Sequence, residues 1–253
     1  MASTTKKIFY YFIGVILLLF IIQLISFIIN DNLIFPNILD IIKEIFNIFS
    51  NNLFYINLLN TLLELIISLL ISILLGTILG LLSGKIKEIG MIFKPIISFL
   101  RCIPIIVIII SSLIIFRNNN IIPYASLILI LFPIIYQAVY EGTISINKYY
   151  IDAYRLESKF NLFIIRKVYL PLISSHSKEA FISSIGLGIK ALITIEYVCG
   201  ISNTIGNSIM NGVNNINYAI IYAYTIILAL LIMLIEIIPL LIKRINNTYP
   251  TIL

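Results

Sequence analysis

The sequence predicts an all-α, polytopic membrane protein with six transmembrane helices in a single domain, residues 1–253. Its residues are 60% hydrophobic and 11% charged, with a mean hydropathy of +1.10, which is more apolar surface than a soluble domain of this length can bury. Apolar runs alternate with short polar breaks, and each run approaches the length of about 20 residues that a helix needs to cross a bilayer. The net charge of +6 is spread over several loops, which favours membrane topology over nucleic-acid binding as its explanation.

Six apolar runs are the expected spans, at about residues 8–29, 57–82, 95–116, 121–140, 179–199 and 218–242. The first run follows a pair of lysines and has no small-residue cleavage site, so we expect a retained span and not a signal peptide. The segment after it carries acidic residues that oppose crossing, and its apolar residues recur with helical rhythm at Ile38, Ile41, Ile42, Ile45 and Phe49. This pattern predicts an amphipathic helix along the outer membrane surface.

Small residues recur at every fourth position where the second run ends, at Gly76, Gly80 and Gly84. Such a stripe lets another helix approach closely, and we expect packing within the chain, with a dimer face as the alternative. Pro104 interrupts the third run and predicts a bend, because a proline removes a backbone donor from the helix. The segment 200–217 is rich in Asn, Gly and Ser, which predicts an irregular connection with, as an option, a short re-entrant turn.

Positive charge is unevenly divided between the two sides of the predicted spans. Thirteen of the 17 Lys and Arg residues lie on the face shared by both termini, namely Lys6, Lys7, Lys85, Lys87, Lys94, Lys148, Arg155, Lys159, Arg166, Lys167, Lys178, Lys243 and Arg244. Basic loops stay on the cytoplasmic side of a membrane. We therefore expect a multi-pass protein of the plasma membrane whose termini, and whose loop at about residues 141–178, are cytoplasmic.

The loop at 141–178 is charged and amphipathic in a chain that is otherwise mostly apolar. We expect two short helices in it, the second capped by Ser158 and ended by Pro171. One helical stripe of this loop is apolar and consists of Phe160, Phe163, Ile164 and Val168. This apolar surface must be buried, either against the ends of the chain's own membrane helices or against a partner protein.

The spacing within this loop resembles that of the coupling loop in ABC importer permeases, whose motif reads EAA, three residues, Gly, nine residues, then Ile, any residue and Leu-Pro. Both spacings are kept here, and the matching positions are Asp152, Ala153, Tyr154, Ser158, Val168, Leu170 and Pro171. The substitutions are Asp for Glu, Tyr for the second Ala, Ser for Gly and Val for Ile. The resemblance implies a type I permease fold whose coupling loop sits in a groove of a separate ATPase subunit.

Two further stretches, PIISFLRCIPII at 95–106 and FPIIYQAVYEG at 132–142, resemble the branch of these permeases that imports nitrate, sulfonates and taurine. That branch implies transport of a small anion or a related organic compound, with no catalysis in this chain. The implied partners are a second permease subunit (a homodimer or a paired chain), two cytoplasmic ABC ATPases that bind ATP and Mg²⁺, an extracytoplasmic solute-binding protein and the lipid bilayer. Nucleic acid is not an expected partner, and no metal or cofactor is expected within this chain.

Charges inside the predicted spans are the candidate translocation residues, because a charge at mid-bilayer costs about 2.5–3.5 kcal/mol and so has a partner or a watery path. They are Glu64, Arg101, Lys190 and Glu196. Arg101 lies near the inner end of its span, where snorkelling is the alternative. The ITIEYVCG run at 193–200 resembles the permease family around Glu196, which either lines the path or makes a structural hydrogen bond. Our hypothesis pairs Glu64 with Lys190.

An ion-coupled secondary transporter is the alternative function, with Glu64, Lys190 and Glu196 as an ion relay. A membrane-embedded enzyme is disfavoured, since the sequence has no zinc-type spacing, nucleophile elbow or Gly-rich phosphate loop. The two cysteines are expected on opposite leaflets, where they cannot form a disulfide. Because the sequence has no phosphate-binding loop, an ATP-driven transporter would take its energy from another subunit.

Overall fold

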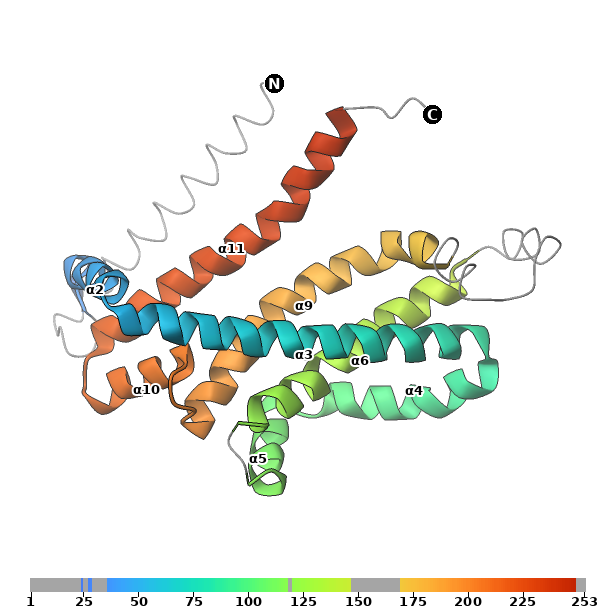
Figure 1. Cartoon of the computed structure of the whole chain (residues 1–253), viewed down its shortest axis with the longest axis horizontal. Helices are drawn as coiled ribbons and strands as arrows, with labels where there is room; N and C mark the ends of the chain where they lie inside the picture. Colours follow the sequence, from blue (N-terminus) through green and yellow to red (C-terminus); the bar gives the residue numbers. More distant parts are fainter. Residues whose placement is uncertain (1–23, 25–26, 29–35, 118–119, 147–168, 249–253) are drawn as a thin grey trace.

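The computed structural model describes residues 24, 27–28, 36–117, 120–146 and 169–248, and within these ranges every regular element is a helix (Figure 1). The helices are α2 (Ile38–Ser50), α3 (Asn52–Lys85), α4 (Lys87–Cys102), α5 (Ile105–Ile115), α6 (Ile122–Ile144), α9 (Leu170–Cys199), α10 (Ile205–Asn214) and α11 (Tyr218–Thr248). The all-α class is therefore confirmed. The first predicted span, apart from Leu24, Phe27 and Ile28, and the central part of the charged loop, 147–168, lie outside the described residues.

In the described ranges, four helices are long and apolar enough to cross a membrane: α3, α6, residues Ser177–Cys199 of α9 and residues Tyr218–Ile235 of α11. A fifth span results if α4 and α5 count as one, although the two helices are bent by 98°. Pro104 causes the break, because it has no amide to donate and it favours an extended conformation at Ile103 (φ −69°, ψ 126°). The run expected as one bent span at 95–116 is thus divided between two helices that meet near a right angle.

Two helices extend into the loop expected at 141–178. α6 continues to Ile144 and α9 starts at Leu170, so the loop is shorter than the charge pattern suggested. Pro171 lies in the first turn of α9, where a missing N–H costs nothing because it has no intrahelical acceptor. The helix that Pro171 was expected to end, from Ser158 to Leu170, lies largely outside the described residues, and Pro171 itself belongs to the first turn of α9.

The segment 200–217 is more regular than its composition predicted. Gly200 ends α9 in the left-handed conformation (φ 62°), which glycine adopts without strain. Thr204 then caps α10, since its hydroxyl oxygen accepts a hydrogen bond from the Asn207 amide at 3.3 Å. The predicted irregular connection is therefore corrected to a pair of turns around a helix of 10 residues.

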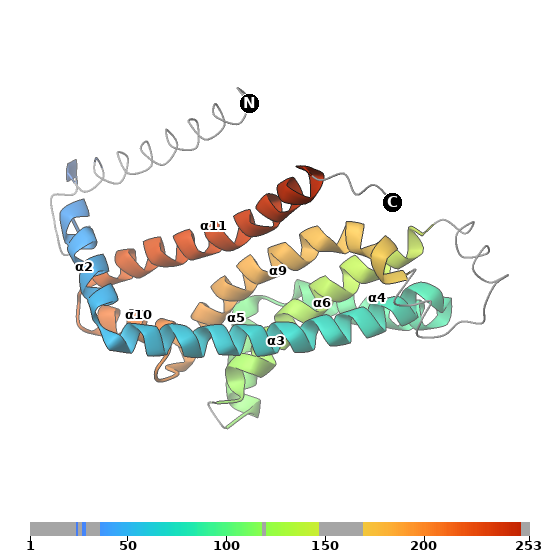
Figure 2. The same ribbon diagram turned by 45° about the horizontal axis from the view of Figure 1, so that its top comes forward.

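α3 lies along α6, and α6 lies along α9, so that these helices form the core of the described structure (Figures 1 and 2). Small side chains dominate the buried face of α3, among them Thr61, Ser68, Ser72, Gly76, Gly80 and Ser83. A Cβ added at Gly76 would lie 2.8 Å from the Ile135 Cγ2 atom, and one at Gly80 would lie 2.9 Å from the Tyr136 carbonyl oxygen. Gly84 approaches α6 in the same way. The glycine stripe thus faces a helix of its own chain.

Shorter helices close one end of this core. α2 lies across the start of α3 and packs against α11, and α10 packs between α9 and α11 (Figure 2). Ile41 and Ile48 of α2 are buried, while Leu39 and Phe46 are exposed. The segment is the amphipathic helix that its sequence rhythm predicted.

We expect Gly80→Val to destabilise the contact between α3 and α6. The valine Cβ would collide with the Tyr136 carbonyl oxygen, a backbone atom that cannot move without shifting α6. Overpacking typically costs about 1–3 kcal/mol, which exceeds the gain of a few tenths of a kcal/mol in helix propensity. Thermal unfolding of the detergent-solubilised protein measures the loss, with Ile78→Val at an exposed position of α3 as the control. An unchanged melting temperature for Gly80→Val would contradict the close contact.

Candidate functional site

Glu196 lies in the last turn of α9 and is completely buried, with an exposed fraction of 0%. Its Oε2 atom accepts a hydrogen bond from the Gly206 amide at 2.8 Å, and its carboxyl group lies beside the hydroxyls of Thr61 and Thr204. The amide belongs to the first turn of α10, where free N–H groups and the helix dipole favour a negative group. A Cβ at Gly206 would lie 2.7 Å from the Ile193 carbonyl oxygen, so glycine permits this approach. The structural hydrogen bond considered for Glu196 is therefore present.

Glu64 reaches the same place from α3. Its side chain is 9% exposed, and its carboxyl group lies against that of Glu196. One oxygen of each group, Oε2 of Glu64 and Oε1 of Glu196, is buried and receives no hydrogen bond from the described donors. The carboxyl groups of Glu64 in α3 and Glu196 in α9, two candidate spans, are therefore in contact.

The hypothetical ion pair between Glu64 and Lys190 is not formed. Lys190 is exposed, and the ion pair in the described part of the chain joins Lys43 to Asp40, at 3.7 Å. Lys190 and Glu196 are six residues apart on α9 and therefore point in different directions. Because Glu64 faces Glu196, it does not also face Lys190.

A polar hollow of about 350 Å³ opens beside Glu64. Amide and hydroxyl groups dominate its lining, namely those of Asn60, Asn120, Tyr124, Ser202, Asn203 and Thr204. The Asn60 Nδ2 atom donates to the Asn203 carbonyl oxygen at 2.9 Å, which joins α3 to the turn between α9 and α10. The lining that the structure describes contains Glu64 and no Lys, Arg or His, so this hollow is acidic in character.

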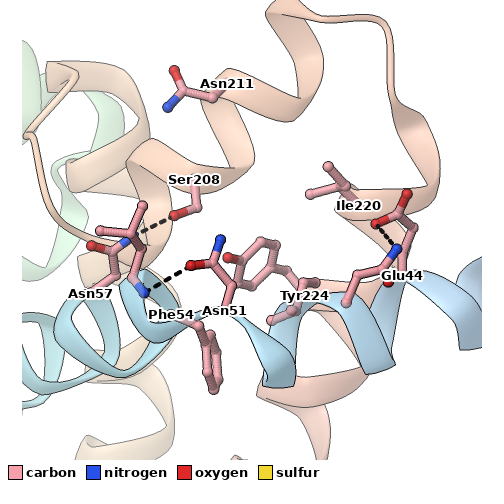
Figure 3. Close-up of a pocket in the computed structure, with 11 residues that line it drawn as sticks. Glu44, Asn51, Phe54, Asn57, Ser208, Asn211, Ile220 and Tyr224 are labelled. Carbon is pink, nitrogen blue, oxygen red and sulfur yellow. Dashed lines mark hydrogen bonds between the residues drawn. The ribbon is translucent and has the colours of Figure 1, made fainter.

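A second polar hollow, of about 290 Å³, lies between α2, α3, α10 and α11 (Figure 3). Asn57 donates from Nδ2 to the Ser208 Oγ atom at 2.8 Å, and Glu44 accepts at Oε1 from the Asn217 Nδ2 atom at 3.2 Å. These bonds connect the short helices to α3 and to the start of α11. Sequence reasoning missed this cluster, whose signal is the recurrence of Asn where the apolar runs begin and end.

Arg101 lies in the last turn of α4, at the break before α5, and it is exposed beside a hollow of about 240 Å³. The other lining residues are apolar and come from α4 to α6 and from α9, and they include Ile105, Pro133 and Leu187. Among the described residues Arg101 forms no ion pair. The structure therefore brings Glu64 and Glu196 together and keeps Arg101 apart from them.

The exposed side of α9 carries polar residues in the middle of a candidate span. Ser183, Lys190 and Thr194 are exposed, and together with Leu187 they recur at the spacing of one helical face. Leu187 also lines the Arg101 hollow, so this face of α9 reaches that hollow at Leu187. Contact with lipid would cost about 2.5–3.5 kcal/mol for the lysine alone. This α9 face therefore requires a polar neighbour, which the described part of the chain does not supply.

The loop motif falls largely outside the described residues. Leu170 and Pro171 form the exposed start of α9. The structure leaves undescribed the other motif positions, which are Asp152, Ala153, Tyr154, Ser158 and Val168. Within the described ranges no group of three or more His, Cys, Asp or Glu residues is placed to hold a metal ion, and Cys102 and Cys199 are free thiols.

Comparison with known protein families gives one match. A family model described as "Binding-protein-dependent transport system inner membrane component" matches residues 72–247, from the middle of α3 through the charged loop nearly to the end of α11. The matched range includes Arg101, Lys190 and Glu196, while Glu64 precedes it. No curated protein matches the chain in a sequence search.

A double-mutant cycle on Asn57 and Ser208 should reveal coupling between α3 and α10. Asn57→Ala and Ser208→Ala each remove one end of the same 2.8 Å hydrogen bond. A net hydrogen bond contributes about 0.5–1.5 kcal/mol, so the double variant should lose less free energy of unfolding than the sum of the single variants by that amount. Denaturant unfolding measures this coupling free energy. As a control, the effects of Asn57→Ala and of Ser183→Ala, which changes an exposed and distant residue, should be additive. Additivity for Asn57 and Ser208 would contradict the contact.

Proposed function

The chain belongs to the family of binding-protein-dependent transport system inner membrane components, the type I permeases of ABC importers, and we propose that it pairs with a second permease subunit to form the membrane path of a small anionic solute. The observation that carries this proposal is the exposed polar face of α9. Lys190 lies on that face, and Arg101 lies beside the hollow that Leu187 of the same face lines. Within a bilayer such a face is stable only against another polar surface or water, and a paired permease provides both.

The charge of the α9 face supports an anion as the solute. A guanidinium binds carboxylate-like groups with two parallel hydrogen bonds, and a lysine ammonium adds a compact positive charge. Nitrate, sulfonates and taurine carry such anionic groups, in agreement with the branch that residues 95–106 and 132–142 resemble. The hollow beside Glu64 has the opposite character and disfavours an anion. We therefore assign the solute to the α9 face and not to that hollow.

We infer that two cytoplasmic ATPases, which bind ATP and Mg²⁺, drive this subunit through its charged loop. The support is the motif spacing from Asp152 to Pro171 and the family match that spans it. α9 runs from Leu170 to Cys199 as one helix of 30 residues, a rod of about 45 Å at 1.5 Å per residue. Movement of the loop is therefore passed along α9 to the Lys190 face, because packed helices shift as units. An extracytoplasmic binding protein delivers the solute from the other side.

An ion-coupled secondary transporter is the competing function, and the buried contact between Glu64 and Glu196 is the observation that favours it. Purification of the chain from its native membrane separates the two functions by their energy source. A permease subunit copurifies with an ATPase whose hydrolysis rises when solute-loaded binding protein is added. A secondary transporter copurifies with none, and its uptake follows an ion gradient.

We expect Lys190→Gln to lower uptake of the anion by about 10- to 100-fold, because a hydrogen bond to a charged group contributes about 1.5–3 kcal/mol. Lys190→Arg keeps the charge and should retain most of the uptake. Lys87→Gln removes an exposed lysine at the start of α4 and is the matched control. Initial uptake rates of the reconstituted transporter measure the effect. Uptake at the wild-type rate by Lys190→Gln would contradict the role of this face.

A further inference from the structure

At the contact between Glu64 and Glu196, two buried oxygen atoms need a hydrogen-bond partner, whatever solute the chain transports. Glu196 Oε2 has the Gly206 amide as its donor, but Glu196 Oε1 and Glu64 Oε2 are buried without a donor among the described residues. A buried carboxylate with neither a hydrogen bond nor a counter-charge is strongly unfavourable. Like charges on touching carboxyl groups would add repulsion to that cost. The two free oxygens therefore need a shared partner.

Two of the polar groups packed around the pair, Thr204 and Asn60, have their donors committed elsewhere, while the Thr61 hydroxyl beside Glu196 accepts from the Ile205 amide at 3.2 Å. The Thr204 hydroxyl donates to the Ile201 carbonyl oxygen at 2.7 Å. The Asn60 side-chain amide donates to the Asn203 carbonyl oxygen at 2.9 Å. The first bond closes the turn between α9 and α10, and the second joins α3 to that turn, so releasing either donor would disturb the turn or its attachment to α3.

The neighbouring helices bring no cation to the two free oxygens. Tyr124 is the titratable residue of α6 that interacts with Glu64. α10 has no charged residue, and neither does α11 from Tyr218 to Ile235. Lys190 of α9 is on another face of its helix and is exposed. Within the described residues, the group that can share a hydrogen bond with each free oxygen is thus the other carboxyl group.

We propose that Glu64 and Glu196 hold one proton between them, as a carboxylic acid hydrogen-bonded to a carboxylate. The proton is bonded to one oxygen and is donated to the other, so a single hydrogen bond satisfies both free atoms. The pair keeps one negative charge, which faces the Gly206 amide at the start of α10, where the helix dipole favours it. Two acids held in contact share a proton for the same reason in aspartic proteases.

This proton-binding site makes the attachment of α3 to the end of α9 depend on one proton. With the proton bound, the two helices are joined by a hydrogen bond inside the core. Without it, two like charges are in contact and favour separation of the helices. Glu64 also lines the hollow of about 350 Å³, whose amides and hydroxyls provide a polar route to the site.

Infrared spectroscopy of the full chain in lipid nanodiscs tests the site, because a protonated carboxylic acid has a carbonyl stretching band that a carboxylate lacks. We expect the wild-type protein to show this band at neutral pH, with a shift to lower frequency in D₂O. Glu64→Gln and Glu196→Gln should each lose it. Glu88→Gln, which changes an exposed carboxyl group of α4, should leave it unchanged.

Thermal unfolding supplies a second measurement. Glu64→Gln should keep the wild-type melting temperature, since its amide donates to Glu196 Oε1 in place of the shared proton, whereas Glu64→Leu should lower it. The proposal is overturned if the wild-type protein lacks the infrared band, or if neither glutamine variant alters it. It is also overturned if Na⁺, K⁺ or Ca²⁺ raises the melting temperature of the wild-type protein but not of Glu64→Gln, because the site would then hold a metal cation.

Discussion

The close approach of α3 to α6 is the constraint on which the rest of the structure depends. Helices in a bilayer have little hydrophobic reason to associate, so packing and hydrogen bonds must hold them together. Gly76 and Gly80 bring the α6 backbone within contact, while large residues such as Leu70 and Leu74 on the other side of α3 stay exposed, as suits lipid. With α3 and α6 in place, α9 packs on α6, and the ends of α9 and α10 come to lie against the first half of α3.

Breaks in the helices decide where charge is tolerated in this fold. A break leaves backbone groups without intrahelical partners, and at membrane depth these must be satisfied by the protein or by water. The break after Gly200 exposes the first amides of α10, and Glu196 satisfies the amide of Gly206. The break at Pro104 places Arg101 beside a hollow. Glu64 and Lys190 both lie within unbroken helices, but Glu64 meets Glu196 near the break after Gly200, whereas the charge of Lys190 must be met from outside the described chain.

Sequence patterns predicted the helices of this fold better than their ends and their partners. Apolar length identifies α3, α6, α9 and α11, because lipid imposes the same minimum length on every span. The start of α9 was missed because Ser174, Ser175 and Lys178 have the composition of a loop, although polar residues also suit a helix that extends beyond the apolar region. α10 was missed because its Asn and Gly residues favour turns, whereas the Thr204 cap starts a helix there.

The partner of Glu64 was mispredicted for a different physical reason. Periodicity shows which residues share a face, but it does not show which face of another helix they meet. The rule that opposite charges pair then favoured Lys190, and the structure instead joins Glu64 to Glu196. Loop spacing was the more reliable signal, because a motif of seven positions in register specifies a family that a single pair of charges does not.

α9 connects the candidate functional features of this chain in a fixed order, and that order restricts the proposed mechanism. The loop motif ends at its first turn, the polar face around Lys190 follows, and Glu196 lies in its last turn. If the loop moves the first turn of α9, the helix must either slide along α6 or lose the contact between Glu196 and Glu64 at its last turn. Gly188 lies so close to α3 that a Cβ there would be 2.9 Å from the Leu65 Cδ1 atom, so sliding meets resistance in the middle of the rod. Under the proposed coupling, the contact between Glu64 and Glu196 is the end of α9 that a movement of the loop would have to disturb, and a group that stabilises this contact opposes that movement.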